Sequence, residues 1–149
     1  MEETEMTVGL PAQLHLRGEA SDIHKLLWPR FVGLRKEHLW RIDLDSRGRV
    51  LGAELVSIGS INMTAAHPRE IFGPALQNGA CKIALVHNHV SGDVRPSSQD
   101  LRFFDRLTTC GMLLGVEVED QLIIHEEKIF SLKADGRTAR GSPWKRRRQ

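Results

Sequence analysis

Residues 82–100 read KIALVHNHVSGDVRPSSQD, and the order of residue types in this stretch predicts a strand, a loop and the start of a helix. Its first five residues are nearly all apolar, which is typical of a central strand buried on both faces. Gly92 and Pro96 then favour turns, and Ser97 is of a type that commonly caps a helix N-terminus. We therefore expect a buried strand whose C-terminal end delivers a polar loop, the place where sites form in open α/β sheets.

Three side chains in this stretch, His87, His89 and Asp100, are of types that bind zinc. Because residues i and i+2 of a strand point to the same side, both histidines can reach one ion. Asp100 follows Ser97 by three residues, so these two share a face of the predicted helix. Three protein ligands are typical of a catalytic zinc site, whose fourth position is left for water. The stretch thus predicts one catalytic zinc ion per chain.

A zinc ion at such a site lowers the pKa of its bound water to about 7. Hydrolysis needs two further groups besides the ion. One group must donate a hydrogen bond to the oxyanion, and the Ser97 hydroxyl is suited to that role. The other must accept the proton of the attacking water, and we expect a glutamate that is not a zinc ligand. This chemical criterion alone does not choose among the glutamates of the chain.

The remaining sequence predicts helices that alternate with strands, so the fold class is α/β. Ser21 is the expected N-cap of a first helix that Pro29 limits, and Gly111 is expected to close the third helix. The predicted helices cover residues 23–28, 68–77 and 99–110. The predicted strands cover residues 38–44, 49–58, 82–86, 113–118, 121–125 and 128–132.

The composition is that of one ordinary globular domain, with 149 residues, 40% hydrophobic and 27% charged. We expect a lead-in over residues 1–20, a folded domain over residues 21–133 and a disordered basic tail over residues 134–149. The formal net charge is only +2, and much of the positive excess lies in residues 145–148. A near-neutral body argues against a nucleic-acid interface over the whole domain.

Targeting and redox features predict a cytoplasmic protein. The N-terminus is acidic and polar, unlike a signal peptide, and no stretch approaches the ~20 apolar residues of a membrane span. Cys81 and Cys110 lie far apart and in no metal-binding pattern, so we expect free thiols that serve as small packing residues.

The spacing HxH, seven residues, SxxD resembles the JAMM motif of the JAB/MPN metallopeptidases. The surrounding residues 66–76 and 85–93 are similar to the RadC-like branch of that family, and the resemblance covers about residues 20–132. It implies a single JAB/MPN-like domain, a curved mixed sheet flanked by helices with a cytidine-deaminase-like architecture. It also implies that His87, His89 and Asp100 hold Zn²⁺.

The resemblance favours Glu37 over Glu54 as the general base, because residues 35–40 match the context of the glutamate in that branch. Three departures from the branch leave the ligand set intact. Val90 stands where many relatives have proline, residues 57–60 replace a Gly-Thr pair usual in the branch, and Gln121 stands where a histidine usually follows the aspartate. The longer RadC proteins carry an N-terminal helix-hairpin-helix module, for which the residues before Ser21 are too few, so we expect essentially the peptidase domain.

The implied function is a zinc-dependent hydrolase of peptide or isopeptide bonds, similar to the isopeptidases and deubiquitinases that remove ubiquitin-like proteins. The expected partner is a protein or peptide substrate, such as a ubiquitin-like protein. A nucleic acid that contacts the basic tail is a second, weakly supported partner. No membrane partner is expected, and a homodimer is left open. The alternative is a DNA-repair-associated RadC-type accessory protein whose zinc is structural or vestigial. A third reading is a scaffold like the metal-free MPN proteins, which retention of both histidines and Asp100 opposes. No residue is assigned to substrate binding.

Overall fold

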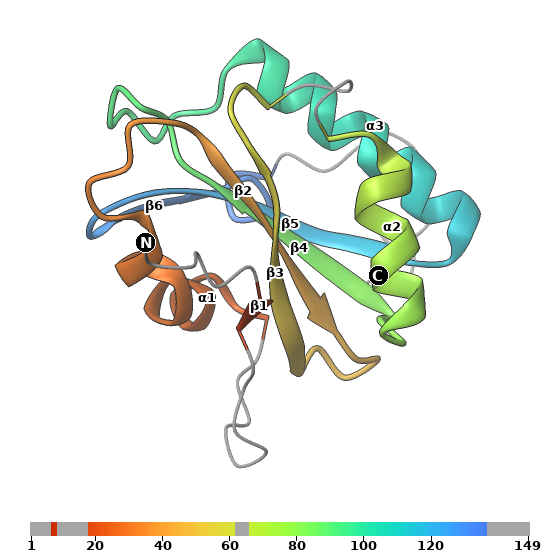
Figure 1. Ribbon diagram of the computed structural model, residues 1–149. Helices are drawn as coiled ribbons and strands as arrows, with labels where there is room; N and C mark the ends of the chain where they lie inside the picture. The colour runs from red at the N-terminus through yellow and green to blue at the C-terminus, as the bar shows by residue number, and fades with distance from the viewer. Residues whose placement is uncertain (1–6, 9–17, 62–65, 137–149) are drawn as a thin grey trace.

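A computed structural model describes residues 7–8, 18–61 and 66–136 of the chain. Its centre is one mixed sheet in the strand order β1-β3-β2-β4-β5-β6 (Figure 1). Neighbouring strands are antiparallel except β4 and β5, which are parallel. The strands are β1 (Thr7–Val8), β2 (His38–Leu44), β3 (Val50–Ile58), β4 (Lys82–His87), β5 (Glu117–His125) and β6 (Lys128–Ser131).

Helices cover both faces of this sheet. Figure 1 shows α2 and α3 on one face and α1 on the other. The helices are α1 (Ala20–Leu27), a 3₁₀ helix η1 (Trp28–Phe31), α2 (Pro68–Gln77) and α3 (Ser98–Leu114). The α/β class with a mixed sheet flanked by helices is therefore confirmed.

Strand β4 separates two hydrophobic cores and places its side chains alternately in each. Ile83 and Leu85 pack into the core under α2 and α3, whereas Ala84 and Val86 pack into the core under α1. This confirms a strand buried on both faces. The alternation also sends His87 toward the α3 side, because it continues the series of Ile83 and Leu85.

Helix α3 is longer than predicted, and Gly111 lies inside it. A side chain at this glycine would place its Cβ only 2.2 Å from the carbonyl oxygen of Val116, so the glycine permits the chain entering β5 to approach the helix. The helix instead ends at Gly115, which has a left-handed φ of 76°. The separate strand predicted for residues 113–118 is wrong: Leu113 is an exposed helical residue, and one strand runs through residues 117–125.

Three smaller expectations also need comment. The N-cap of helix α1 lies two residues earlier than predicted, at Glu19 rather than Ser21, and the first bond of the helix joins the Ile23 amide to the Glu19 carbonyl at 3.0 Å. Cys81 is exposed, so its expected packing role is wrong, whereas the partly buried Cys110 packs against the core. Most of the predicted lead-in, and residues 137–149 of the predicted tail, lie outside the described residues. Within the described part, no helix has the length and apolar character needed to span a membrane.

Candidate metal centre

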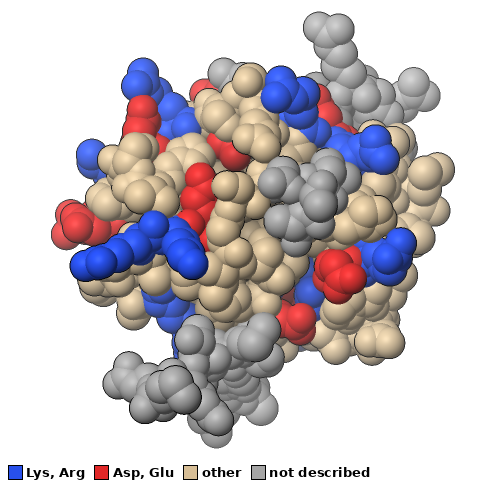
Figure 2. Space-filling view, turned by 45° about the horizontal axis from the view of Figure 1, so that its top comes forward, with Lys and Arg blue, Asp and Glu red and all other residues tan. Residues whose placement is uncertain are grey.

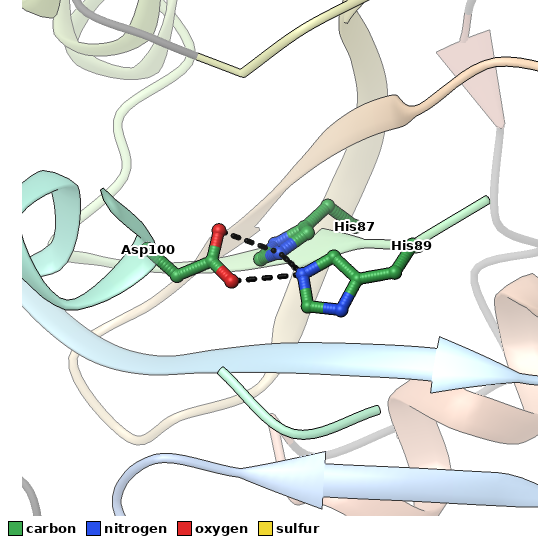
Figure 3. Close-up of side chains that lie close together, drawn as sticks. All are labelled: His87, His89 and Asp100. Carbon is green, nitrogen blue, oxygen red and sulfur yellow. Dashed lines mark hydrogen bonds and ion pairs between the residues drawn. The ribbon is translucent and has the colours of Figure 1, made fainter. Parts of the chain in front are cut away.

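Three side chains converge where β4 ends and α3 begins. His87 is the last residue of β4, His89 follows two residues later, and Asp100 lies in the first turn of α3. Their nearest nitrogen and oxygen atoms all lie within 4.8 Å of one another. Figure 3 shows the Asp100 carboxylate pointing from the helix toward the ring nitrogens of both histidines. The structure therefore brings together the three residues predicted as zinc ligands.

The contacts among these atoms are short. His89 Nε2 lies 2.8 Å from Asp100 Oδ2, and His87 Nε2 lies 3.2 Å from Asp100 Oδ1. The two Nε2 atoms are 3.4 Å apart. His87 and Asp100 are buried, while His89 is partly exposed. Two imidazoles and a carboxylate that present one atom each to a common point are a donor set that suits zinc.

The same contacts change the acid–base properties of the group. Burial of Asp100 opposes its ionisation, but the hydrogen bonds from His87 and His89 hold the pKa of the carboxyl well below its usual range. The hydrogen bond to Asp100 raises the pKa of His89 above its ordinary value. Burial of His89 lowers this pKa, and the hydrogen bond to the Asp93 carbonyl raises it further. The raised pKa of His89 and the lowered pKa of Asp100 both favour an ion pair of a protonated His89 and an ionised Asp100.

The outer ring nitrogen of each histidine has its own partner. The Nδ1 atom of His89 lies 2.6 Å from the carbonyl oxygen of Asp93, and Nδ1 of His87 lies 3.3 Å from the side-chain nitrogen of Gln121. Gln121 is fully buried, and its Oε1 has no hydrogen-bond partner among the described residues. A histidine that binds a metal through Nε2 carries a proton on Nδ1 and needs an acceptor there. Turning the Gln121 amide by half a rotation offers Oε1 to that proton, so the residues present fit a metal ion.

The start of α3 fixes Asp100. Ser97 is the N-cap, and its Oγ accepts a hydrogen bond from the backbone N–H of Asp100 at 3.1 Å. In return, Asp100 Oδ2 accepts from the backbone N–H of Ser97 at 2.8 Å. Among the hydrogen bonds of the described residues Ser97 Oγ acts only as an acceptor, so its own proton is available to another group.

A cleft of about 690 Å³ opens beside the three ligands, and it is lined by Glu37, His89, Ser97 and Asp100, among others. Glu37 Oε2 accepts a hydrogen bond from the backbone N–H of Ile61 at 3.3 Å. The structure therefore places both residues proposed for catalysis, Glu37 and Ser97, next to the ligand set.

The rival glutamate has a different environment. Glu54 lies on β3, where its carboxylate is 3.5 Å from the Arg41 guanidinium on β2, and it does not line the cleft. Its neighbour on the other side is Thr7 of β1. Of the two glutamates considered for the general base, Glu37 lines the cleft and Glu54 does not.

Loop residues between the histidines and the helix have mainly local roles. The Asp93 carboxylate accepts hydrogen bonds from the backbone and side chain of Arg95, which lower the pKa of Asp93 to about 2. These contacts lie within the loop itself, as is common for an aspartate in a turn. Asn88 is hydrogen-bonded to the chain on both sides of Glu37.

Sequence reasoning missed Gln121 as a partner of His87. The one available signal was that a glutamine replaces the histidine usual at this position in the RadC-like branch. That replacement does not identify His87 as the partner of Gln121, because the contact joins residues 34 positions apart on neighbouring strands.

Charged side chains on the face shown in Figure 2 are of both signs and are interspersed. Among the described residues of that face, lysine and arginine do not gather in one region. A protein that binds nucleic acid over a broad surface usually presents a basic patch or stripe.

Comparison with known proteins gives one family and many relatives. The model of the family described as RadC-like JAB domain matches residues 18–137. A UPF0758 protein of Methanococcoides burtonii is 41% identical over 117 residues, which are 78% of this chain and 51% of the relative. A UPF0758 protein of Desulforudis audaxviator is 44% identical over 101 residues, 68% of this chain and 44% of the relative. The chain thus spans about half the length of the curated relatives it matches.

Proposed function

Because the chain belongs to the family of RadC-like JAB domains, we propose that it is a zinc-dependent hydrolase that cleaves peptide or isopeptide bonds. The observation that carries this proposal is the convergence of His87, His89 and Asp100 beside a cleft that Glu37 and Ser97 also line. A structural zinc site is normally closed by four protein ligands, whereas three ligands beside an open cleft are typical of a catalytic site. This argument favours a hydrolase over a RadC-type accessory protein with a structural or vestigial ion.

His87, His89 and Asp100 would hold the ion, which when bound supplies a Lewis acid that polarises an amide carbonyl and activates water. Glu37 accepts a proton from the attacking water as the new carbon–oxygen bond forms. The Ser97 hydroxyl, whose proton is available, donates a hydrogen bond to the oxyanion of the tetrahedral intermediate. Glu37 then passes its proton to the nitrogen of the leaving amine as the carbon–nitrogen bond breaks.

Within this reaction class, we propose a substrate with an extended C-terminal tail, such as that of a ubiquitin-like protein. The resemblance to JAMM peptidases motivates the choice. An extended tail presents its amide bonds without prior unfolding, so it can enter a cleft that would not admit a folded domain.

The test is cleavage of a proteome-derived peptide library by the zinc-loaded protein, with the products identified by mass spectrometry. A ubiquitin-like protein with a C-terminal peptide fusion is the second substrate. We expect Glu37→Gln to keep its zinc, measured by elemental analysis, and to lose turnover by a factor of about 10²–10⁴.

Glu54→Gln is the matched control, since it removes the same charge outside the cleft, and it should cleave at a rate close to that of the original protein. Equal loss in both variants, or no cleavage of either substrate by the zinc-loaded protein, would contradict the proposal.

A further inference from the structure

We propose that Asn88, the residue between the two histidines, is a positioning residue that holds Glu37 at the metal centre. This inference rests on the proposed role of Glu37 as the proton acceptor. It starts from the pairing of β2 with β4, which is antiparallel and sets Leu39 opposite His87. Extending this register by one residue sets His38 opposite Asn88, and by two residues it sets Glu37 opposite His89. The strand that delivers the metal ligands therefore runs beside the segment that carries the glutamate.

Main-chain pairing between these strands stops at Leu39 and His87, and the Asn88 side chain takes its place. Its Oδ1 accepts a hydrogen bond from the backbone N–H of His38 at 2.7 Å, and its Nδ2 donates to the carbonyl oxygen of Lys36 at 3.2 Å. These are the main-chain groups on either side of Glu37. One side chain thus fixes the peptide units before and after the glutamate.

The position of Asn88 in the strand explains why this contact does not compete with metal binding. Side chains alternate along an extended chain, so Asn88 points away from the side that His87 and His89 share. Asn88 is also only 5% exposed. A buried amide with both its oxygen and its nitrogen bonded is held in one orientation, because an unmade bond to either buried group would cost free energy.

Two further contacts complete the fixation of Glu37. Its carbonyl oxygen accepts from the backbone N–H of Gly59 at 2.8 Å, and its carboxylate accepts from the backbone N–H of Ile61 at 3.3 Å. Both contacts come from the segment after β3. Asn88 is different, because it ties the glutamate to the strand that also carries the metal ligands. A shift of about 1 Å in a reacting group can cost roughly 10²-fold in rate, so this tie matters for catalysis.

Among side chains of this length, only asparagine offers both an amide oxygen and an amide N–H. Aspartate keeps the acceptor for His38 but lacks the donor for Lys36, and alanine lacks both. The variants Asn88→Ala and Asn88→Asp therefore form a graded series. Asn78→Ala is a matched control, because Asn78 also donates a side-chain hydrogen bond, to Asp43 Oδ2 at 3.1 Å, and lies outside the cleft lining.

The first experiment measures geometry and needs no substrate. The full chain is loaded with Co²⁺, and the paramagnetic shift of the ¹³C-labelled Glu37 carboxyl carbon is recorded by NMR and assigned by its absence in Glu37→Gln. Hydrogen exchange of the His38 amide is measured on the same samples. In Asn88→Ala we expect one bound metal ion, a changed Glu37 shift and faster exchange at His38. Asn88→Asp should show an intermediate shift, and Asn78→Ala should match the original chain.

The second experiment is a double-mutant cycle with the peptide that the original protein cleaves best. Asn88→Ala should lower kcat by about 10²-fold and change KM by less than about 2-fold. In the Glu37→Gln background the same substitution should have no further effect, since the group that Asn88 positions is gone. Effects that multiply would show a structural role independent of Glu37 and would overturn the inference.

The two experiments separate this inference from the function on which it rests. If Glu37→Gln keeps full turnover, Glu37 is not the proton acceptor and the proposed function fails. Asn88 would then only hold two segments of the fold together. If Glu37→Gln is inactive but Asn88→Ala leaves the Glu37 shift and kcat unchanged, only the positioning role is overturned.

Discussion

Ser97 and Asp100 cap each other at the start of α3, with the backbone N–H of each donating to the side chain of the other at 2.8 and 3.1 Å. The Asp100 oxygen that accepts from Ser97 is also the one that lies 2.8 Å from His89. The first turn of a helix therefore sets the direction of the Asp100 carboxylate, which we propose as a metal ligand. The cap uses the Ser97 oxygen and the proposed reaction uses its proton, so a substitution of Ser97 bears on both stability and turnover, which can be measured separately.

Replacing Ser97 with alanine should affect both properties. Loss of the cap is expected to lower the free energy of unfolding by about 0.5–2 kcal/mol, measured by urea denaturation of the zinc-loaded protein. Loss of the donor to the oxyanion should lower kcat by about 10²–10³-fold. Ser97→Thr keeps the hydroxyl and should keep most of both properties. A variant Ser97→Ala that is less stable but turns over at the original rate would assign Ser97 to the cap alone.

Replacing His87 with alanine should abolish stoichiometric zinc binding. His87 is fully buried and is one of three converging ligands, so its loss leaves two protein ligands, fewer than catalytic zinc sites use. Elemental analysis after dialysis measures the zinc content. His24→Ala is the matched control, because His24 bonds to the Glu126 carbonyl and does not line the cleft, and this variant should retain one ion per chain. Unchanged zinc in His87→Ala would show that the ligand assignment is wrong.

Much of this centre could be predicted because its parts are local in the sequence. The i, i+2 alternation of a strand places His87 and His89 together, and the first turn of a helix places Ser97 beside Asp100. The strand that supplies the histidines is recognisable from its apolar residues alone. The choice of Glu37 needed the resemblance to a family, because no local rule brings residue 37 to residue 87.

The features that could not be predicted depend on contacts between distant segments. Gly111 resembles a helix stop in the sequence, but it is required because the Val116 carbonyl approaches the helix there. Leu113 and Leu114 suggested a strand by their apolar character, yet both are exposed at the end of α3. The partner of His87 at Gln121 follows from the parallel pairing of β4 with β5, whose register the sequence does not specify.

Replacing Gln121 should alter zinc affinity without removing a ligand. In Gln121→Leu the Nδ1 proton of a metal-bound His87 loses its acceptor, and we expect zinc to bind roughly 10–100-fold more weakly. Competition with a chromophoric chelator measures this dissociation constant. Gln121→Glu restores an acceptor and should bind zinc more tightly than the leucine variant does. Equal affinity in all three proteins would show that the Gln121 amide does not orient His87.

Stability of the metal-free chain should depend on pH through His89 and Asp100. The raised pKa of His89 stabilises the fold below the unfolded value of about 6.5, and this contribution is lost as pH rises through the folded pKa. The lowered pKa of Asp100 stabilises the fold above the unfolded value of about 3.9, and this contribution is lost as pH falls through the folded pKa. The two contributions overlap fully between about pH 4 and pH 6.5.

The variant Asp100→Asn tests this window, because asparagine keeps an acceptor for the Ser97 amide and removes the charge. Urea unfolding in the presence of a chelator should show a loss of roughly 1.5–3 kcal/mol at pH 5 to 6 and a smaller loss at pH 8. Asp93→Asn is the control: its pair with Arg95 is exposed, so its removal should change stability less and the change should fade in salt. A loss for Asp100→Asn that is constant from pH 5 to pH 8 would show that the charge on His89 contributes nothing to the fold.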